Sequence, residues 1–575
     1  MITKAELKNL IDVASGRKKA DLLIKNCNVV DVYNGEILKD NVAISNGYIA
    51  GLGDYKADKI YDAKGGYVSP GLIDSHIHIE SSYCTPEEFG KMVVPHGTTR
   101  IIADPHEIVN VCGLAGFDYM LEASKQTALS IKFMMPSCVP ATKLEDSGAI
   151  IKASDMKDYM SNPNIPGLGE MMDFVAVENA DDDVLDKITL AKQHGKIIDG
   201  HSPNVFGKHL NAYTAAGIKT DHECSTPEEM NDKLQKGMYV QLRQGSACHN
   251  LETLAKGITD FNFRRCLLCS DDRQPKTIFE QGHLEHQLKK LVSMGINPII
   301  AISMATSNVA DCYNFDDIGV IAPGKKADIV IFDNLNDFNV KTVFINGEKI
   351  AENGIYLKKI VKADQTNVRH TMNIDFDKNR LKMHLKAGKV NAIEMIPGEV
   401  LTKKCEIEVN TDENGDFLYD DSIDVVKCAV LERHKNTGKV GLGFIKGYGM
   451  KSGAVAASVA HDSHNIICVG TDNNDMQKAI ETVIDSDGGF AIAKNGHVLE
   501  SLPLPIGGIM SDKSGKEVAE KLDSLHDIAV KELGVSDKIE PIMTLTFMSL
   551  IVIPELKITA RGIFSVGENK FISLQ

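Results

Sequence analysis

The sequence contains no tryptophan, few other aromatic residues and no long apolar run. Phe and Tyr together make up 6% of its 575 residues. The longest apolar stretches, such as residues 542–554, are shorter than the roughly 20 residues that a transmembrane helix needs. Residues 1–20 are charged and lack the apolar segment of a signal peptide. We therefore expect a soluble, cytoplasmic protein that has no membrane partner.

Positive charge is also in short supply. The chain has 63 Lys and Arg against 79 Asp and Glu, a formal net charge of −16, and no basic block stands out. Such a surface repels a phosphate backbone, so we expect no nucleic-acid partner. The 12 cysteines are scattered, and several lie inside apolar runs, as Cys468 does. This pattern indicates buried free thiols in a reducing compartment.

The length and the patterning divide the chain into domains. A chain of 575 residues is too long for one hydrophobic core. Residues 21–70 alternate apolar and polar positions around Asn-Gly pairs, which is typical of β-hairpins, and residues 323–354 repeat this texture. The two pieces predict one composite β domain, formed by residues 1–70 plus 320–365.

The middle of the chain, residues 71–319, repeats a different unit. Short apolar runs are each followed by a helix-like stretch over roughly 250 residues, the size of a TIM barrel. Polar residues gather where the runs end, which in a barrel is the catalytic face. We therefore predict an α/β protein with a TIM-type (β/α)8 barrel. Residues 366–575 mix strands and helices and predict a C-terminal α+β domain.

The first motif with chemical meaning is His76-Ile-His78. Alternate residues of a strand point to the same face, so these two imidazoles can converge on one ion. The pair is weak by itself, because the same spacing arises often by chance. Its context strengthens it, since Pro70 and Gly71 introduce an apolar strand that leads to the two histidines.

Further metal-binding residue types stand at the ends of later predicted strands. Each of them alone has an ordinary structural explanation. Together with the His pair they form a set of four imidazoles and two carboxylates, which suits Zn, Mn or Fe(II) and two ions that share a bridging group. The predicted ligands are His76, His78, Glu170, His201, His222 and Asp271. Asp104, His106 and Glu107 end the second strand and are candidates for contacts in or around this site.

A competing motif is the H-x-E formed by His78 and Glu80. It opens the signature of the zinc nucleoside deaminases, which also requires P-C-x-x-C. The chain offers only Cys266-Leu-Leu-Cys269, which follows Arg265 rather than proline and lies in an apolar strand. We interpret these two cysteines as core residues.

Longer stretches carry a family resemblance that covers nearly the whole chain. The metal-ligand pattern is that of the amidohydrolase superfamily, and the chain resembles the bacterial adenine deaminases within it. The segments beyond the barrel, residues 461–472 and 499–511, lie outside the general superfamily pattern and make the resemblance specific. The supporting stretches are residues 70–82, 103–117, 167–173, 200–218, 242–251, 269–275, 319–330, 461–472 and 499–511.

The resemblance implies an activity and its requirements. The expected reaction is hydrolytic deamination of adenine to hypoxanthine and ammonia, in purine salvage. The expected cofactors are two divalent ions per subunit, Mn²⁺ or Fe²⁺, with Zn²⁺ as a further option. The expected partners are a small purine base and water, and the superfamily often forms homo-oligomers.

The resemblance also suggests catalytic roles, some of which stay open. Many superfamily members use a carboxylated lysine on the fourth strand, whereas this chain has Glu170 there. Glu170 could bridge the metals or donate a proton to the substrate ring, and Glu80 is a second candidate for protonating N1. Asp271 would take the proton of the attacking hydroxide and pass it to the departing amine. We interpret Lys132 as structural.

The residues that read the substrate are the least defined. Strand-end residues could bond purine nitrogens or could form salt bridges at the barrel rim: Arg243, Gln244, Ser246, Asp272 and Arg273. His461, Asp462 and His464 could form a loop at the barrel mouth, a second metal site or a polar turn. Two other functions stay open: an amidohydrolase reaction on another cyclic amide or amidine, and a non-catalytic scaffold.

Overall fold

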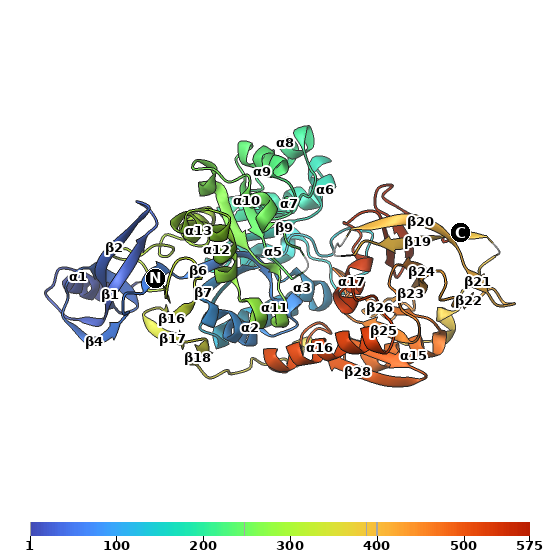
Figure 1. The fold of residues 1–575 in the computed structure, drawn as a ribbon. Helices are drawn as coiled ribbons and strands as arrows, with labels where there is room; N and C mark the ends of the chain where they lie inside the picture. The colour runs from blue at the N-terminus through green and yellow to red at the C-terminus, as the bar shows by residue number, and fades with distance from the viewer. Residues whose placement is uncertain (1, 247, 387, 398–400) are drawn as a thin grey trace.

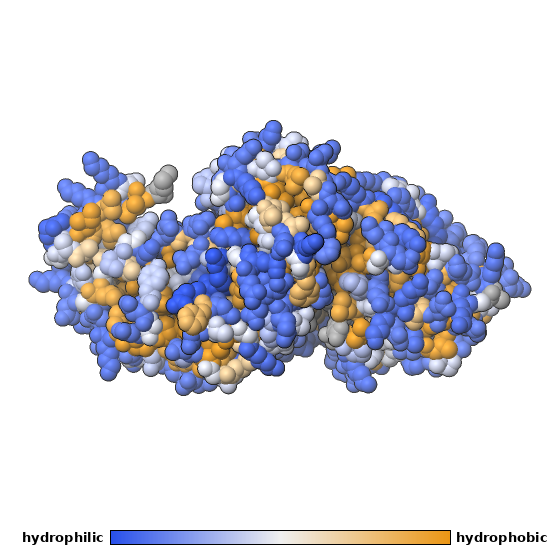
Figure 2. All heavy atoms as spheres, turned by 90° about the horizontal axis from the view of Figure 1, so that it is seen from above, coloured by the Kyte–Doolittle hydropathy of each residue, from blue (hydrophilic) through white to orange (hydrophobic). Residues whose placement is uncertain are grey.

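The computed structural model describes residues 2–246, 248–386, 388–397 and 401–575. Helix α1 (Lys4–Ala14) and a β-sheet lie at one end of the molecule, parallel strands with helices fill the middle, and a second large sheet lies at the other end (Figure 1). Hydrophilic residues cover most of the face seen in Figure 2, with hydrophobic residues in smaller groups between them. Within the described residues, no helix has the length and apolarity to cross a membrane.

The first sheet contains strands from two separate parts of the chain. Its order is β18-β17-β16-β15-β5-β1-β2-β3, with β4 also paired to β1. Antiparallel pairing of β5 with β15 joins the two parts, with Val68 opposite Ile331. The strands are β1 (Ala20–Asp31), β2 (Glu36–Ser45), β3 (Tyr48–Leu52), β4 (Ala57–Asp62), β5 (Tyr67–Pro70), β15 (Ile329–Phe332), β16 (Val340–Ile345), β17 (Glu348–Glu352) and β18 (Ile355–Tyr356).

The Asn-Gly pairs form the tight turns that their sequence predicts. Asn46-Gly47 joins β2 to β3 and Asn346-Gly347 joins β16 to β17, and all four residues have positive φ angles between 49° and 80°. Such angles at both central positions are typical of a two-residue hairpin turn that matches the twist of the strands. A side chain at Gly47 would lie 2.9 Å from the Asn346 carbonyl, so the two turns also pack against each other.

The middle of the chain consists of short parallel strands that follow one another in sequence. Every residue of β6, β7, β9, β12 and β13 is buried, as expected for parallel strands that are covered on both faces. The predicted apolar runs are these strands: β6 (Leu72–His78), β7 (Thr98–Ala103), β8 (Ser130–Phe133), β9 (Gly167–Met171), β10 (Ile197–Gly200), β11 (Thr220–Asp221), β12 (Tyr239–Arg243), β13 (Cys266–Cys269) and β14 (Asp271–Asp272).

Hydrogen bonds group these strands as β14-β6-β7-β8, β9-β10 and β11-β12-β13. The groups are connected: Met135, just after β8, forms a parallel bridge with Leu168 of β9. The amide of Lys219, just before β11, donates to the carbonyl of Ile198 in β10 at 2.9 Å. All carboxyl ends of the strands therefore face the same way, which places the predicted ligands on one side.

Helices follow the strands along the middle of the chain, and their starts carry recognisable caps. At α9, for example, the Thr226 hydroxyl accepts a hydrogen bond from Glu229 N at 3.2 Å, and Pro227 occupies the first helical position. The helices are α2 (Pro86–Val93), α3 (His106–Cys112), α4 (Leu114–Ala123), α5 (Ala153–Ser161), α6 (Phe174–Glu178), α7 (Asp182–Gln193), α8 (Gly207–Ala215), α9 (Pro227–Gln235), α10 (Leu251–Ala255), α11 (Pro275–Gln281), α12 (Leu284–Ser293), α13 (Pro298–Met304) and α14 (Ser307–Tyr313).

The C-terminal part is β-rich, with helices packed on its sheet. The large sheet has the order β20-β19-β24-β23-β26-β25-β27-β28. Its elements are β19 (Lys389–Met395), β20 (Thr402–Glu408), β21 (Asn410–Thr411), β22 (Phe417–Leu418), β23 (Val425–Leu431), β24 (Val440–Lys446), β25 (Ala454–Ala457), β26 (Ile466–Gly470), α15 (Asn473–Asp485), β27 (Gly489–Lys494), β28 (His497–Pro503), α16 (Gly515–Lys531), α17 (Pro541–Thr546), β29 (Leu556–Thr559), β30 (Gly562–Ser565) and β31 (Lys570–Ile572).

Charged contacts attach the C-terminal part to the loops that follow the parallel strands. Arg561, after β29, bonds both oxygens of Asp146 at 2.8 Å, and Lys439 approaches the same carboxylate at 3.0 Å. On another side, α16 packs against α2 and α11, with Lys276 and Asp523 2.7 Å apart. The two parts therefore meet over the side of the parallel strands where the predicted ligands lie.

A close approach of β24 to β29 gives a test of how the C-terminal part is held together. A Cβ at Gly441 would lie 1.8 Å from the Thr559 carbonyl oxygen, so alanine cannot fit without moving the backbone. We expect Gly441→Ala to destabilise this part by about 1–3 kcal/mol. Thermal unfolding followed by circular dichroism would show a lower midpoint than in the unmodified protein.

Gly567→Ala is the matched control, because Gly567 is exposed and an added Cβ there meets nothing within 4 Å. Equal melting of the Gly441→Ala protein and the unmodified protein would contradict the close packing of these two strands.

Candidate metal centre

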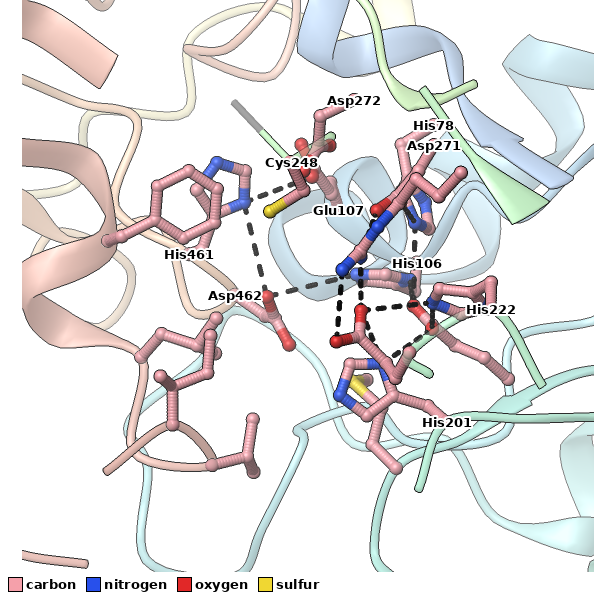
Figure 3. Close-up of a pocket in the computed structure, with 18 residues that line it drawn as sticks. His78, His106, Glu107, His201, His222, Cys248, Asp271, Asp272, His461 and Asp462 are labelled. Atoms are coloured by element: carbon pink, nitrogen blue, oxygen red, sulfur yellow. Dashed lines mark hydrogen bonds and ion pairs between the residues drawn. The ribbon is translucent and has the colours of Figure 1, made fainter. Parts of the chain in front are cut away.

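The six predicted ligands lie together at the carboxyl ends of the parallel strands. His76 and His78 end β6, Glu170 is on β9, and Asp271 begins β14. His201 and His222 directly follow β10 and β11. His78, His201, His222 and Asp271 converge on one region in Figure 3. Five of the six are buried, and His201 is partly buried.

The carboxylate of Glu170 occupies the centre of this group. Its Oε2 lies 3.0 Å from His201 Nδ1, 3.1 Å from His222 Nε2 and 3.9 Å from His76 Nε2. Its Oε1 lies 3.5 Å from His78 Nε2 and 3.4 Å from His106 Nδ1. One carboxylate thus faces five imidazoles, an arrangement that brings both oxygens to the nitrogen atoms of different ligands.

The tautomers and distances of this group fit divalent metal ions. His78 Nδ1 lies 2.9 Å from the Asp104 carbonyl, and a proton donated there leaves the Nε2 lone pair free. Metal-binding histidines commonly use their second nitrogen in this way. His76 Nε2 is 3.2 Å from His78 Nε2, and Asp271 Oδ1 is 3.2 Å from the latter. Potential ligand atoms lie within 4.8 Å of one another in three overlapping groups: His76/His78/Glu170, His76/His222/Asp271 and Glu170/His201/His222.

Both carboxylates are held in the anionic form that a cation requires. Burial alone would raise the pKa of Glu170, but hydrogen bonds from His201 and His222 hold that pKa well below its usual range. Burial also acts on Asp271, where the guanidinium of Arg243 and the imidazole of His78 keep the pKa of the carboxyl well below its usual range. The site therefore offers two anionic ligands at neutral pH.

Arg243 connects Asp271 to an acidic residue that the sequence analysis missed. Its Nη1 lies 2.6 Å from Asp271 Oδ2, and its two terminal nitrogens bond both oxygens of Glu223. Glu223 also lies 3.5 Å from His222 Nε2 and 3.8 Å from His201 Nδ1. Its position directly after His222 at a strand end is a signal that could have identified it.

A small cavity opens between the metal-binding residues and the C-terminal part (Figure 3). Its volume is about 60 Å³. The parallel strands and their loops supply its polar side, and the C-terminal part supplies the opposite wall. The lining residues are His78, His106, Glu107, Glu170, Met172, His201, His222, Glu223, Arg243, Cys248, Asp271, Asp272, His461, Asp462, Phe547, Leu550, Val552 and Ile553.

Residues 104–107, predicted to lie in or around the site, contact both sides of the cavity. Asp104 Oδ2 accepts a hydrogen bond from Glu170 N at 2.8 Å. Only glycine fits at position 169, where a Cβ would lie 2.2 Å from the same Asp104 oxygen. His106 lies between Glu170 and Asp462, with its Nε2 3.8 Å from Asp462 Oδ1.

The loop at residues 461–464 reaches the barrel mouth, one of the roles considered for it. His461 Nδ1 lies 3.0 Å from Glu107 Oε1, and the His461 ring stacks on Phe547 at 4.5 Å. Burial alone would lower the pKa of His461, but the Glu107 carboxylate raises it to about 9. His464 lies behind this pair, with Nε2 3.7 Å from Glu107 Oε2, and Glu107, His461 and His464 also form a possible metal-binding group.

Several predicted substrate contacts are directed elsewhere. Arg273 bonds the backbone carbonyls of Gln244, Gly245 and Gly282, and Ser246 bonds Thr277 at 2.8 Å. Glu80 accepts a hydrogen bond from Ile108 N at 3.3 Å. The predicted residues that lie outside the cavity lining are Glu80, Asp104, Gln244, Ser246, Arg273 and His464.

The remaining lining residues gave no recognisable signal. Phe547, Leu550, Val552 and Ile553 belong to an apolar stretch whose sequence resembles any core segment. Cys248 is another lining residue that the sequence did not indicate. Cys266 and Cys269, in contrast, are fully buried in β13, as expected for core residues.

Comparison with known proteins agrees with this geometry. The amidohydrolase family matches residues 67–350, and the adenine deaminase C-terminal domain matches residues 399–570. The chain is 52% identical over 575 residues to adenine deaminase 2 of Desulfotalea psychrophila, covering 100% of both chains. It is 47% identical over 572 residues to the adenine deaminase of Ligilactobacillus salivarius, covering 99% of each. The chain belongs to the adenine deaminase family.

This membership confirms the resemblance seen in the sequence and gives the metal-binding residues their context. The amidohydrolase family match spans every predicted ligand from His76 to Asp271. The adenine deaminase C-terminal domain match spans the opposite wall, including His461, Asp462 and Phe547. Both walls of the cavity therefore lie in regions that this adenine deaminase family member shares with known families.

Removing the charge of Glu170 tests its central place. We expect Glu170→Gln to lower metal affinity by more than the about 10- to 100-fold typical of changes in outer-shell partners, because a neutral amide replaces the anion among the imidazoles. Elemental analysis after dialysis against a graded chelator would measure the loss. Glu178→Gln, which alters an exposed carboxylate paired with His209, should keep its metal. Equal metal retention by the two variants would contradict the assignment.

Proposed function

We propose that this protein hydrolyses adenine to hypoxanthine and ammonia, with the cavity between the metal-binding residues and the C-terminal part as its active site. The observation that carries the proposal is the convergence of His76, His78, Glu170, His201, His222 and Asp271 beside a cavity whose far wall belongs to the adenine deaminase C-terminal domain. The names of the full-length relatives support adenine as the substrate.

The proposal includes an organisation for the whole chain. The parallel strands form a TIM-type (β/α)8 barrel over residues 71–319. Residues 1–70 and 320–365 form the composite β domain, and residues 366–575 form the C-terminal domain. The enzyme acts as a homo-oligomer in the cytoplasm, in purine salvage, with adenine and water as its partners.

The cofactors of the proposed reaction are two divalent ions per subunit, Mn²⁺ or Fe²⁺, with Zn²⁺ as a further option. His76, His78, His201, His222 and Asp271 would hold them, and Glu170 would bridge them. Such ions lower the pKa of water from 15.7 to about 7 and so supply hydroxide at neutral pH. The central position of Glu170 supports the bridging role over proton donation, because both of its oxygens face imidazoles.

Asp271 carries protons in the proposed reaction. Its Oδ1 faces His78 and its Oδ2 accepts from Arg243, so the carboxylate is fixed at the edge of the cavity. From there it takes a proton from the nucleophile and delivers it to the amino group that leaves C6. The products are hypoxanthine and ammonia, which balance adenine and one water.

Ring nitrogen N1 needs a second proton source. Glu80 is less well placed for this than predicted, because it lies outside the cavity lining and bonds the Ile108 amide. Asp272 and Glu223 do line the cavity. Burial and the neighbouring Asp271 raise the pKa of Asp272 to about 6, so Asp272 is the better candidate for the proton donor.

Turnover of adenine tests the proposed function directly. Protein loaded with Mn²⁺ or Fe²⁺ should convert adenine, seen as a change in ultraviolet absorbance, and should release one ammonia per adenine. Elemental analysis of the same sample establishes that the ions are bound. Ring opening of a cyclic amide without ammonia release from adenine would favour another amidohydrolase reaction. Absence of any conversion with two ions bound would overturn the adenine assignment.

Asp271→Asn tests the proton carrier. An amide cannot accept and return the proton, so kcat should fall by about 10²–10⁴-fold. Metal content is measured in parallel, because Asp271 also lies among the ligands. Near-normal turnover with intact metal content would exclude the proposed role, whereas Asp182→Asn, on the surface at the start of α7, should leave kcat unchanged.

A further inference from the structure

The C-terminal wall of the cavity carries one polar atom with an unmet requirement. Asp462 is 3% exposed and lines the cavity, and its Oδ2 is buried without a hydrogen-bond partner among the described residues. Leaving a buried acceptor unsatisfied costs about 1–3 kcal/mol, and more for a charged group. A ligand that offers an N–H to this oxygen would remove that cost.

The surroundings of Asp462 leave this oxygen for a ligand. The imidazoles of His106 and His461 approach its other oxygen, Oδ1, at 3.8 and 4.0 Å. His461 is itself held by Glu107 at 3.0 Å and by stacking on Phe547. Asp462 is therefore fixed on a built wall, and it faces the metal-binding residues across the cavity (Figure 3).

The distance between the two sides suits a purine. The single imidazole of His106 bridges from Glu170 to Asp462, with a contact of 3.4 Å on one side and 3.8 Å on the other. In adenine, the amino group on C6 lies opposite the edge formed by N3 and N9. When C6 faces the metal-binding residues, that edge faces the C-terminal wall, and N9–H is the donor it presents.

The size of the cavity points in the same direction. Its volume of about 60 Å³ is far below the roughly 300–1,000 Å³ of pockets for drug-sized ligands. Beside Asp462, the wall continues with Phe547, Leu550 and Val552, which are apolar. A substituent on N9, such as the sugar of a nucleoside, would meet this wall and remove the N–H.

We propose that Asp462 selects the free base by accepting the N9–H of adenine, so that the C-terminal part is the specificity-determining wall of the site. This inference rests on the proposed function for the identity of the substrate. It assigns the discrimination between a base and its N9-substituted derivatives to one carboxylate outside the metal-binding barrel.

A cycle of two substrates and two proteins tests the proposal. The unmodified enzyme should prefer adenine over 9-methyladenine by about 10²-fold or more in kcat/KM, because sites built to bond an N–H reject analogues without it. In Asp462→Ala, kcat/KM for adenine should fall about 10- to 100-fold, as expected for a lost hydrogen bond to a charged group. The preference for adenine over 9-methyladenine should fall at least tenfold, since the variant has lost the acceptor and gained space.

The ratio distinguishes recognition from a structural role. If Asp462 only supports the fold, both substrates lose the same factor and the ratio stays unchanged, which would overturn the proposal. Greater sensitivity of 7-methyladenine than of 9-methyladenine would also overturn it, because Asp462 would then read the other imidazole nitrogen. Asp462→Asn keeps the shape of the side chain and should give a smaller shift in the same direction if the alanine variant does not fold.

A binding measurement separates this proposal from the proposed function. Dissociation constants of hypoxanthine and 9-methylhypoxanthine, measured by calorimetry, give the same ratio without turnover. A ratio that falls in Asp462→Ala supports the role of Asp462 even if adenine is not the substrate, and an unchanged ratio refutes it even if adenine is deaminated. Asp485→Ala, exposed at the end of α15 in the same part of the chain, is the control and should leave both ratios unchanged.

Discussion

The structure depends on one buried carboxylate that faces five imidazoles. Glu170 has no direct access to water, yet burial does not neutralise it, because His201 and His222 contact its oxygens at 3.0 and 3.1 Å. Its backbone is held as firmly as its side chain: the amide donates to Asp104, and Ser137 donates to its carbonyl at 2.5 Å. An anion fixed in this way gives the histidines around it a common centre, and a divalent cation matches the charge and donor types that result.

The supports of this centre extend outward through residues that are not ligands. Asp104 positions both Glu170 and, through its carbonyl, His78. Gly169 keeps room for the Asp104 carboxylate. Arg243 bonds Asp271 and Glu223 together. Such partners set the orientation of ligands and the charge at the metal, so a loss at one of them changes the whole site.

The C-terminal part completes the site from the other side. Asp146 on a loop of the parallel-strand region bonds Arg561 and Lys439, and Glu107 bonds His461. These contacts hold the 461–464 loop and the 547–553 segment over the ligand-bearing strand ends. The barrel side supplies the residues for hydrolysis, and the C-terminal side limits the size and the polarity of what can reach them.

The sequence by itself determined the strands, their order and the set of metal-binding residues. Alternating or continuous apolar runs reveal where strands lie, and parallel strands place their ends on one side, so His76, His78, Glu170, His201, His222 and Asp271 could be grouped from their positions alone. The Asn-Gly turns at 46–47 and 346–347 were readable for the same reason, because the backbone angles there demand those residue types.

Only the tertiary structure decided what surrounds these ligands. Arg243, Ser246 and Arg273 all stood near strand ends in the sequence, but side-chain direction separates them: Arg243 reaches the cavity, while Ser246 and Arg273 bond neighbouring loops. Glu223 was overlooked beside His222, although it contacts two of the histidines. Asp462 and Phe547 come from a separate part of the chain, and no local pattern encodes a contact that forms only when two parts dock. Periodicity records which residues are buried in one element, whereas the partner across an interface depends on long-range packing.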